Sequence, residues 1–232
     1  MSYSKPKTES PVTCEIEWAG AFDKGYLNRY DKTKKEQVVI DNGFSFIELD
    51  SRHAVRGYNK ATKSSILSNE VENIGSEDMR VFKFVNGQAK TICEGIYKDI
   101  KGEFQSEGGK YAKIVYALVT KSKDELATAG SIIKITVKGS FLGPYIDGVK
   151  GGFEVEMTGH EEKRNGGTAF RAPTLKLNPI DANQDKLAMD SDEKLQEYFL
   201  QYKRSKNTTT DVGEELGAEV VVSGDIEEDA PF

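Results

Sequence analysis

Residues 111–142, YAKIVYALVTKSKDELATAGSIIKITVKGSFL, decide the fold class that the sequence predicts. Residues 111–121 are rich in β-branched and aromatic side chains, which favour a strand. In residues 131–142, apolar side chains alternate with lysine and threonine, as in a strand with one buried face. Between the two, residues 122–125 (SKDE) have capping-box spacing and predict a short helix through Ala129.

Further segments of the strand type lie on both sides of this stretch. Asp41-Asn42-Gly43 and Asn86-Gly87 are typical of tight hairpin turns, because Asn-Gly tolerates positive φ. The first turn predicts that residues 38–40 pair with residues 44–49. The predicted strands outside 111–142 are residues 12–18, 38–40, 44–49, 79–85, 88–97, 153–158 and 168–177.

The chain is therefore predicted to be mainly β. Several strands, a short helix and more strands match the order of an elaborated OB-fold barrel, whose helix follows the third strand. A β-sandwich is the alternative. The folded OB-type domain would span residues 12–206, after a disordered lead at 1–11. Near residues 181–205, apolar positions at helical spacing predict a C-terminal helix, which residues 190–192 could divide.

Charge is distributed unevenly along the chain. The 32 Lys and Arg and 38 Asp and Glu give a net charge of −6. No basic residue follows Lys206, whereas residues 207–232 contain eight acids, leaving 30 acids and a net charge of +2 for the rest. Residues 207–232 are thus predicted to be a disordered acidic interaction tail. No apolar run is long enough for a membrane span, and the N-terminus does not resemble a signal peptide.

The chain ends Gly224-Asp225-Ile226-Glu227-Glu228-Asp229-Ala230-Pro231-Phe232. This tip resembles that of bacterial and phage single-stranded DNA-binding proteins, an acidic run closed by Pro-Phe or Phe. The resemblance implies sequence-independent protection of single-stranded DNA during replication, recombination and repair. It also implies recruitment of a polymerase, helicase, primase or nuclease through Asp225, Glu227, Glu228, Asp229, Pro231 and Phe232.

The physical chemistry of the tip suits such recruitment. Phe232 offers an aromatic anchor and a free carboxylate at one point, which a basic-rimmed apolar pocket can bind. The acids could also compete with DNA for the protein's own cationic groove. The alternatives are a purely solubilising tail and a virion structural or assembly protein. Homo-oligomerisation stays open, and the expected location is cytoplasmic, in the host if the chain is viral.

Single-strand binding requires cations for phosphates and aromatic faces for bases. Two segments, 24–35 and 52–63, combine both, and the second is expected to be a loop between strands. A third, weaker group lies in residues 80–84. Trp18 is as consistent with the core as with a stacking platform. The predicted DNA-binding residues are Tyr26, Arg29, Tyr30, Lys34, Lys35, Arg52, Arg56, Tyr58, Lys60, Lys63, Arg80 and Lys83.

Enzyme motifs are lacking. The spacing of a zinc site is not found among Cys14, Cys93, His53 and His160. The two cysteines are expected to be reduced thiols rather than a disulfide. Neither a phosphate-binding P-loop nor a G-x-S-x-G motif occurs. We therefore expect no catalytic activity, metal or cofactor.

Overall fold

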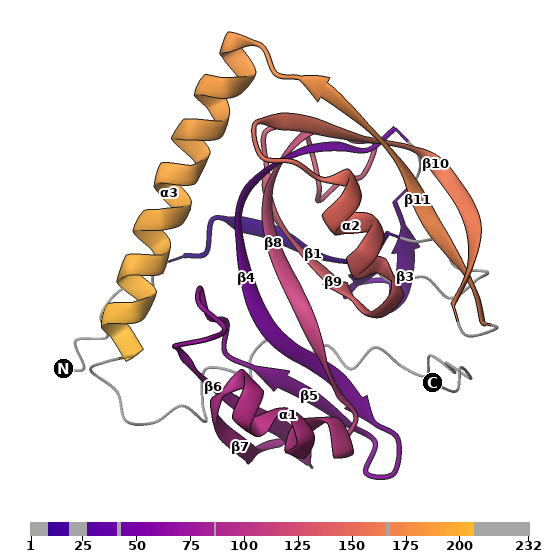
Figure 1. The fold of residues 1–232 in the computed structure, drawn as a ribbon. Coiled ribbons are helices and arrows are strands. Elements are labelled where there is room, and N and C mark those ends of the chain that lie inside the picture. Colours follow the sequence, from indigo (N-terminus) through magenta and orange to yellow (C-terminus); the bar gives the residue numbers. More distant parts are fainter. Residues whose placement is uncertain (1–8, 19–26, 41–42, 86, 166–167, 207–232) are drawn as a thin grey trace.

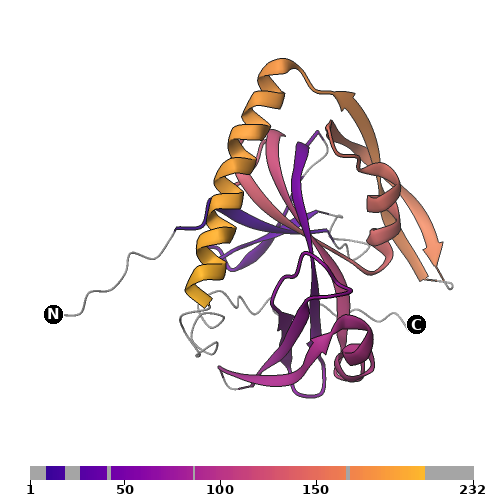
Figure 2. The ribbon, with the colours of Figure 1, turned by 60° about the vertical axis from the view of Figure 1, so that its left-hand side comes forward.

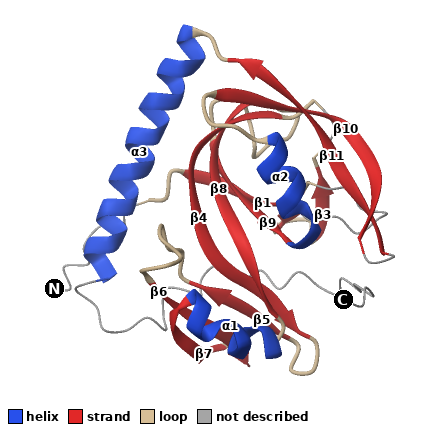
Figure 3. Ribbon diagram, in the orientation of Figure 1, coloured by secondary structure: helices blue, strands red, loops and turns tan. Residues whose placement is uncertain are grey.

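The computed structural model describes residues 9–18, 27–40, 43–85, 87–165 and 168–206. They form one mixed sheet with helices, so the protein is mainly β, as predicted (Figures 1 and 3). The strands are β1 (Val12–Trp18), β2 (Asn28–Asp31), β3 (Glu36–Val39), β4 (Ser45–Asn59), β5 (Ser64–Ser68), β6 (Asp78–Val85), β7 (Gln88–Ile96), β8 (Gly109–Lys121), β9 (Ile132–Lys138), β10 (Phe153–Asn165) and β11 (Thr168–Pro179). The helices are α1 (Tyr97–Ser106), the 3-10 turn η1 (Gly139–Phe141), α2 (Leu142–Gly148) and α3 (Ala182–Lys206).

Four strands form a Greek key. β4, β8 and β9 are antiparallel neighbours, and β10 returns through η1 and α2 to pair with β4. β11 then pairs with β10. The helix between the third and fourth of these strands is the feature that the OB prediction required. Among the described residues β11 pairs with β10 alone, so this side of the sheet stays open.

The remaining strands extend this Greek key in two directions. β1 pairs in parallel with β9 and leads to β2 and β3 at one edge of the sheet. β5, β6, β7 and α1 form an insertion between β4 and β8, at the other edge. Near the end of β4, the chain comes very close to the backbone just before β8. A Cβ at Gly57 would lie only 2.3 Å from the carbonyl oxygen of Gly108. Glycine is therefore needed at position 57.

Three hydrophobic clusters hold these parts together. The main core contains Trp18, which is completely buried and contacts Tyr145 of α2 edge-on. The insertion has its own core, in which Phe104 of α1 packs against β4, β6 and β7 residues. The third cluster joins α3 to the opposite side of β4 and β8. Figures 1 and 2 show α1 and α2 on one side of the β4–β8 ladder and α3 on the other.

Each predicted strand coincides with, or overlaps, an observed one, but the predicted hairpin between residues 38–40 and 44–49 is wrong. β3 pairs with β2 at the edge of the sheet, whereas β4 lies beside β8 in its middle. Phe44, the residue just before β4, is bonded to a distant strand: its carbonyl accepts from the Met157 amide of β10 at 2.9 Å. Long-range pairing therefore overrides the local turn signal. The hairpin at Gly87, between β6 and β7, is confirmed.

The predicted helix at residues 122–129 is also wrong. Asp124 instead accepts hydrogen bonds from the amides of Leu126 and Ala127, at 2.9 and 3.0 Å, and from Arg29. The capping signal therefore closes a turn, because an aspartate can satisfy these amides without a helix following. The helices between strands are α1 and α2.

The predicted C-terminal helix is confirmed as one continuous helix, α3. It does not break at residues 190–192, where Ser191 is buried and its hydroxyl donates to the Leu187 carbonyl at 2.7 Å. Leu195 and Phe199 are buried and attach α3 to the sheet.

Candidate nucleic-acid interface

Arg29, predicted to contact DNA, is instead part of a buried ion pair. Its Nε lies 2.9 and 2.8 Å from the two carboxylate oxygens of Asp124, and its side chain is 4% exposed. A second acid, Asp31, lies 3.6 Å away. Arg29 therefore joins β2 to the turn at Asp124 and presents no free guanidinium to a ligand.

Residues 52–59 are not a loop, because they continue β4. Arg52 is buried, with its guanidinium 3.0 Å from Glu72, 3.2 Å from Asp50 and 3.6 Å from the centre of the Phe199 ring. Arg56 lies 3.3 Å from Glu70. Both guanidinium groups are thus engaged within the fold. The sequence did not predict these contacts, because charged residues on a strand are usually exposed to solvent.

The other predicted residues lie in three places. Tyr30 is half-buried on β2, and Lys34 and Lys35 are exposed in the turn after it. Tyr58, 42% exposed, precedes Lys60 and Lys63 in the β4–β5 turn. The insertion carries two ion pairs, Arg80 with Glu94 at 3.2 Å and Lys83 with Glu107 at 2.9 Å. Tyr26 and the tail residues lie outside the described residues. The two turns are separated in the sheet by β1, β9 and β8, so the structure does not gather these residues into one surface.

A different group of aromatic and cationic side chains does converge, on the face of β4 and β8 turned toward α1 and α2. Tyr111 and Lys113 share this face of β8, and His53 is opposite Lys113 in the ladder. On the same face, Val55 belongs to the insertion core and Val115 to the main core. The three side chains therefore lie in the span between two packed cores.

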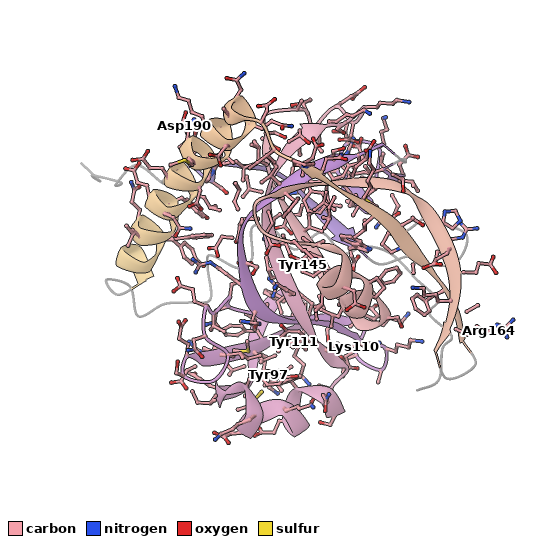
Figure 4. All side chains as sticks on the ribbon, turned by 45° about the horizontal axis from the view of Figure 1, so that its top comes forward. Tyr97, Lys110, Tyr111, Tyr145, Arg164 and Asp190 are labelled. Carbon is pink, nitrogen blue, oxygen red and sulfur yellow. The ribbon has the colours of Figure 1, made fainter. Side chains whose placement is uncertain are left out.

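Helices α1 and α2 each add one tyrosine to this span. Tyr97 opens α1, and its ring meets the Tyr111 ring edge-on at 5.8 Å between centroids. Tyr145 comes from α2, and Lys113 Nζ lies 5.3 Å from the centroid of its ring. Figure 4 shows Tyr97 and Tyr111 next to each other, with Tyr145 beyond them. We call His53, Tyr97, Tyr111, Lys113 and Tyr145 the tyrosine face.

Hydrogen bonds fix the rings of the tyrosine face. His53 Nδ1 and the Tyr111 hydroxyl are 2.7 Å apart, and the two rings lie 5.8 Å apart. The Tyr145 hydroxyl donates to Glu48 at 2.7 Å. Tyr145 is 2% exposed, so it supports Lys113 rather than offering a surface. His53, Tyr97 and Tyr111 are half-buried, so none of the three residues is fully enclosed.

Lys113 is the cation of the tyrosine face, and Glu48, which accepts from the Tyr145 hydroxyl, is a neighbouring acid. Burial lowers the pKa of His53 below its usual value, and the nearby charge of Lys113 lowers it further. Burial raises the pKa of Tyr111, and Tyr97 adds to that shift. The imidazole is therefore neutral near pH 7, both phenols stay protonated, and the lysine supplies the positive charge.

This combination can hold a single strand. Accessible aromatic rings stack with bases, and a neighbouring ammonium group attracts phosphate. Lys101 is an exposed cation of α1 and lies one helical turn after Tyr97. On the opposite face of β8, Ala112, Ile114 and Tyr116 are covered by α3. On the face toward α1 and α2, His53, Tyr111 and Lys113 are only half-buried.

The sequence held part of this signal. Tyr111 and Lys113 are two residues apart in a predicted strand, so they had to share a face. Nothing in the sequence showed that Tyr97 and His53 would join them. Tyr97 is placed by the packing of α1 against β8, and His53 by the pairing of β4 with β8.

The chain matches no protein-family model, no curated protein and no solved structure.

Other kinds of site receive no support from the described part of the chain. No group of three or more His, Cys, Asp or Glu residues there could hold a metal ion. Cys14 and Cys93 are free and belong to different cores, and burial raises the pKa of each thiol to about 11. Neither thiol is therefore activated as a nucleophile. Within the described ranges, no helix combines the length and apolar character needed to cross a bilayer.

Proposed function

We propose that the protein binds single-stranded DNA without sequence preference along the tyrosine face, and recruits replication or recombination proteins through its acidic C-terminal tip. The tyrosine face is the observation that carries the proposal. Its half-buried rings at Tyr97 and Tyr111 can stack with any base, since every base has a π face. Lys113 and Lys101 supply cations for the phosphates.

Two further observations support the same function. The strands that bear the tyrosine face belong to a Greek key with OB-type order, an architecture that commonly binds oligonucleotides. The charge distribution fits as well, because the acids that make the chain negative are concentrated after Lys206. The rest of the chain, at +2, does not repel a polyanion.

The decisive experiment is a titration of a dye-labelled dT oligonucleotide, followed by fluorescence anisotropy at low and high salt. We expect binding at low salt. For about two phosphate contacts, at Lys113 and Lys101, a tenfold rise in salt should weaken binding by about 25-fold, because single-strand affinity falls with a log–log slope of about −0.7 per phosphate. Competition by a duplex of the same length tests strand selectivity. If low salt gives no binding, the proposal is wrong and the virion-protein alternative gains.

Deleting residues 224–232 is expected to keep or raise affinity for the dT oligonucleotide, because a competing polyanion is removed. The same deletion should abolish binding to the partner among purified polymerase, helicase, primase and nuclease. Phe232→Ala is the matched variant: it keeps every acid but removes the anchor, so only partner binding should fall. A severe loss of DNA affinity on deletion would contradict the competitor role, and full partner binding by Phe232→Ala would contradict the anchor.

A further inference from the structure

His53 has a backbone partner on each side and a side-chain partner on β8. Its backbone pairs with β8 at Lys113 on one side. On the other, its amide donates to the Val71 carbonyl at 2.8 Å, and the Val71 amide donates back at 2.9 Å. Its imidazole then reaches the Tyr111 hydroxyl at 2.7 Å. A ring fixed in this way can in turn fix the Tyr111 ring.

The charged group that acts on His53 is Lys113, and the acids nearby are bonded to other residues. From β8, Lys113 is the charged neighbour and Tyr111 is the hydrogen-bonding one. From α1, Tyr97 reaches it through Tyr111, and from α2, Tyr145 contacts Lys113 and bonds to Glu48. The two acids beside Val71 are engaged elsewhere: Glu70 with Tyr116, Arg56 and Lys134, and Glu72 with Arg52.

We propose that His53 is a positioning residue for the stacking ring of Tyr111, and that its protonation couples nucleic-acid binding to pH. This inference rests on the proposed function and adds a regulatory property to it. The hydrogen bond survives in both protonation states: Tyr111 can donate to neutral Nδ1, and protonated Nδ1 donates to the Tyr111 oxygen. The ring therefore stays in place while the charge of the site changes.

The direction of the coupling follows from electrostatics. In the free protein, burial and Lys113 oppose a charge on His53, and its pKa is lowered. A bound phosphate beside Lys113 adds negative charge and favours the imidazolium. Binding then takes up a proton, so affinity rises as pH falls through the pKa values of the bound and free states. If phosphate raises the His53 pKa by about one unit, affinity increases about tenfold across that range.

The test is the dissociation constant of a dT oligonucleotide between pH 5.5 and 8, at constant ionic strength and with a pH-insensitive dye. Thymine has no group that titrates in this range. We expect roughly tenfold tighter binding at the acid end for the native chain. His53→Gln should bind more weakly and show no pH dependence. His160→Gln is the matched control, because it removes the only other histidine, and it should keep the pH dependence.

Tyr111→Phe separates positioning from charge. It retains the ring and His53 but removes the hydroxyl, so affinity should fall at every pH while the pH dependence remains. Binding that is flat with pH in the native chain, or pH-dependent in His53→Gln, overturns the inference and leaves the proposed function intact. Absence of binding at every pH overturns both.

Discussion

Tyr111→Leu is expected to weaken binding to a dT oligonucleotide at low salt by about fivefold to 150-fold. The estimate follows from roughly 1–3 kcal/mol for each stacked base, with tenfold in affinity for every 1.4 kcal/mol. Tyr111 is central to the tyrosine face because His53 bonds its hydroxyl and Tyr97 packs against its ring. Leucine keeps much of the apolar contact with Tyr97 while removing the flat face. The measurement is anisotropy with a labelled oligonucleotide, alongside thermal unfolding of each variant.

Two further tyrosine variants serve as controls for Tyr111→Leu. Tyr202→Leu changes a residue of α3, on the far side of the β4–β8 ladder, and should leave affinity unchanged (Figure 1). Tyr58→Leu changes an exposed ring beside the β4–β5 turn, within the segment that the sequence favoured. If Tyr58→Leu weakens binding more than Tyr111→Leu does, the interface lies at that turn and the tyrosine face is the wrong surface.

Local patterns predicted most of the strands and the C-terminal helix, because each depends on neighbouring residues, but they missed β2, β5, α1 and α2. The alternation at residues 12–18 and 132–138 follows directly from one buried sheet face. Pairing is different. Gly43 has the positive φ that its turn signal predicted, +86°, yet β3 and β4 are not neighbours in the sheet. A turn residue fixes backbone direction, whereas partner choice depends on burial across the whole sheet.

The candidate site was harder to predict, for a related reason. Cationic and aromatic residues in one segment look like a binding loop. In the structure, however, Arg52 is paired with Glu72 and Arg56 with Glu70, and both acids follow β5. Conversely, Tyr97 and Tyr111 look unremarkable until α1 brings their rings together. Burial and partnership are tertiary properties, so composition alone could not separate structural cations from available ones.

Arg29→Ala is expected to lower the free energy of unfolding by about 3–5 kcal/mol, because it leaves the buried Asp124 carboxylate without the guanidinium whose Nε bonds both of its oxygens. Burial alone would raise the pKa of Asp124, but hydrogen bonds from the Ala127 amide and Arg29 outweigh burial and hold it below the usual value. The pair therefore stabilises the fold above the unfolded-state pKa of about 4, and its contribution is lost as pH falls through the lower folded-state pKa.

Urea denaturation followed by the fluorescence of the buried Trp18 measures this loss. Lys34→Ala is the matched control from the same segment: it removes an exposed cation and should change stability by no more than about 0.5 kcal/mol. The folded Arg29→Ala protein should bind the dT oligonucleotide as tightly as the native chain, because Arg29 is enclosed by Asp124 and Asp31. Weaker DNA binding without a loss of stability would return Arg29 to the nucleic-acid interface and contradict its structural role.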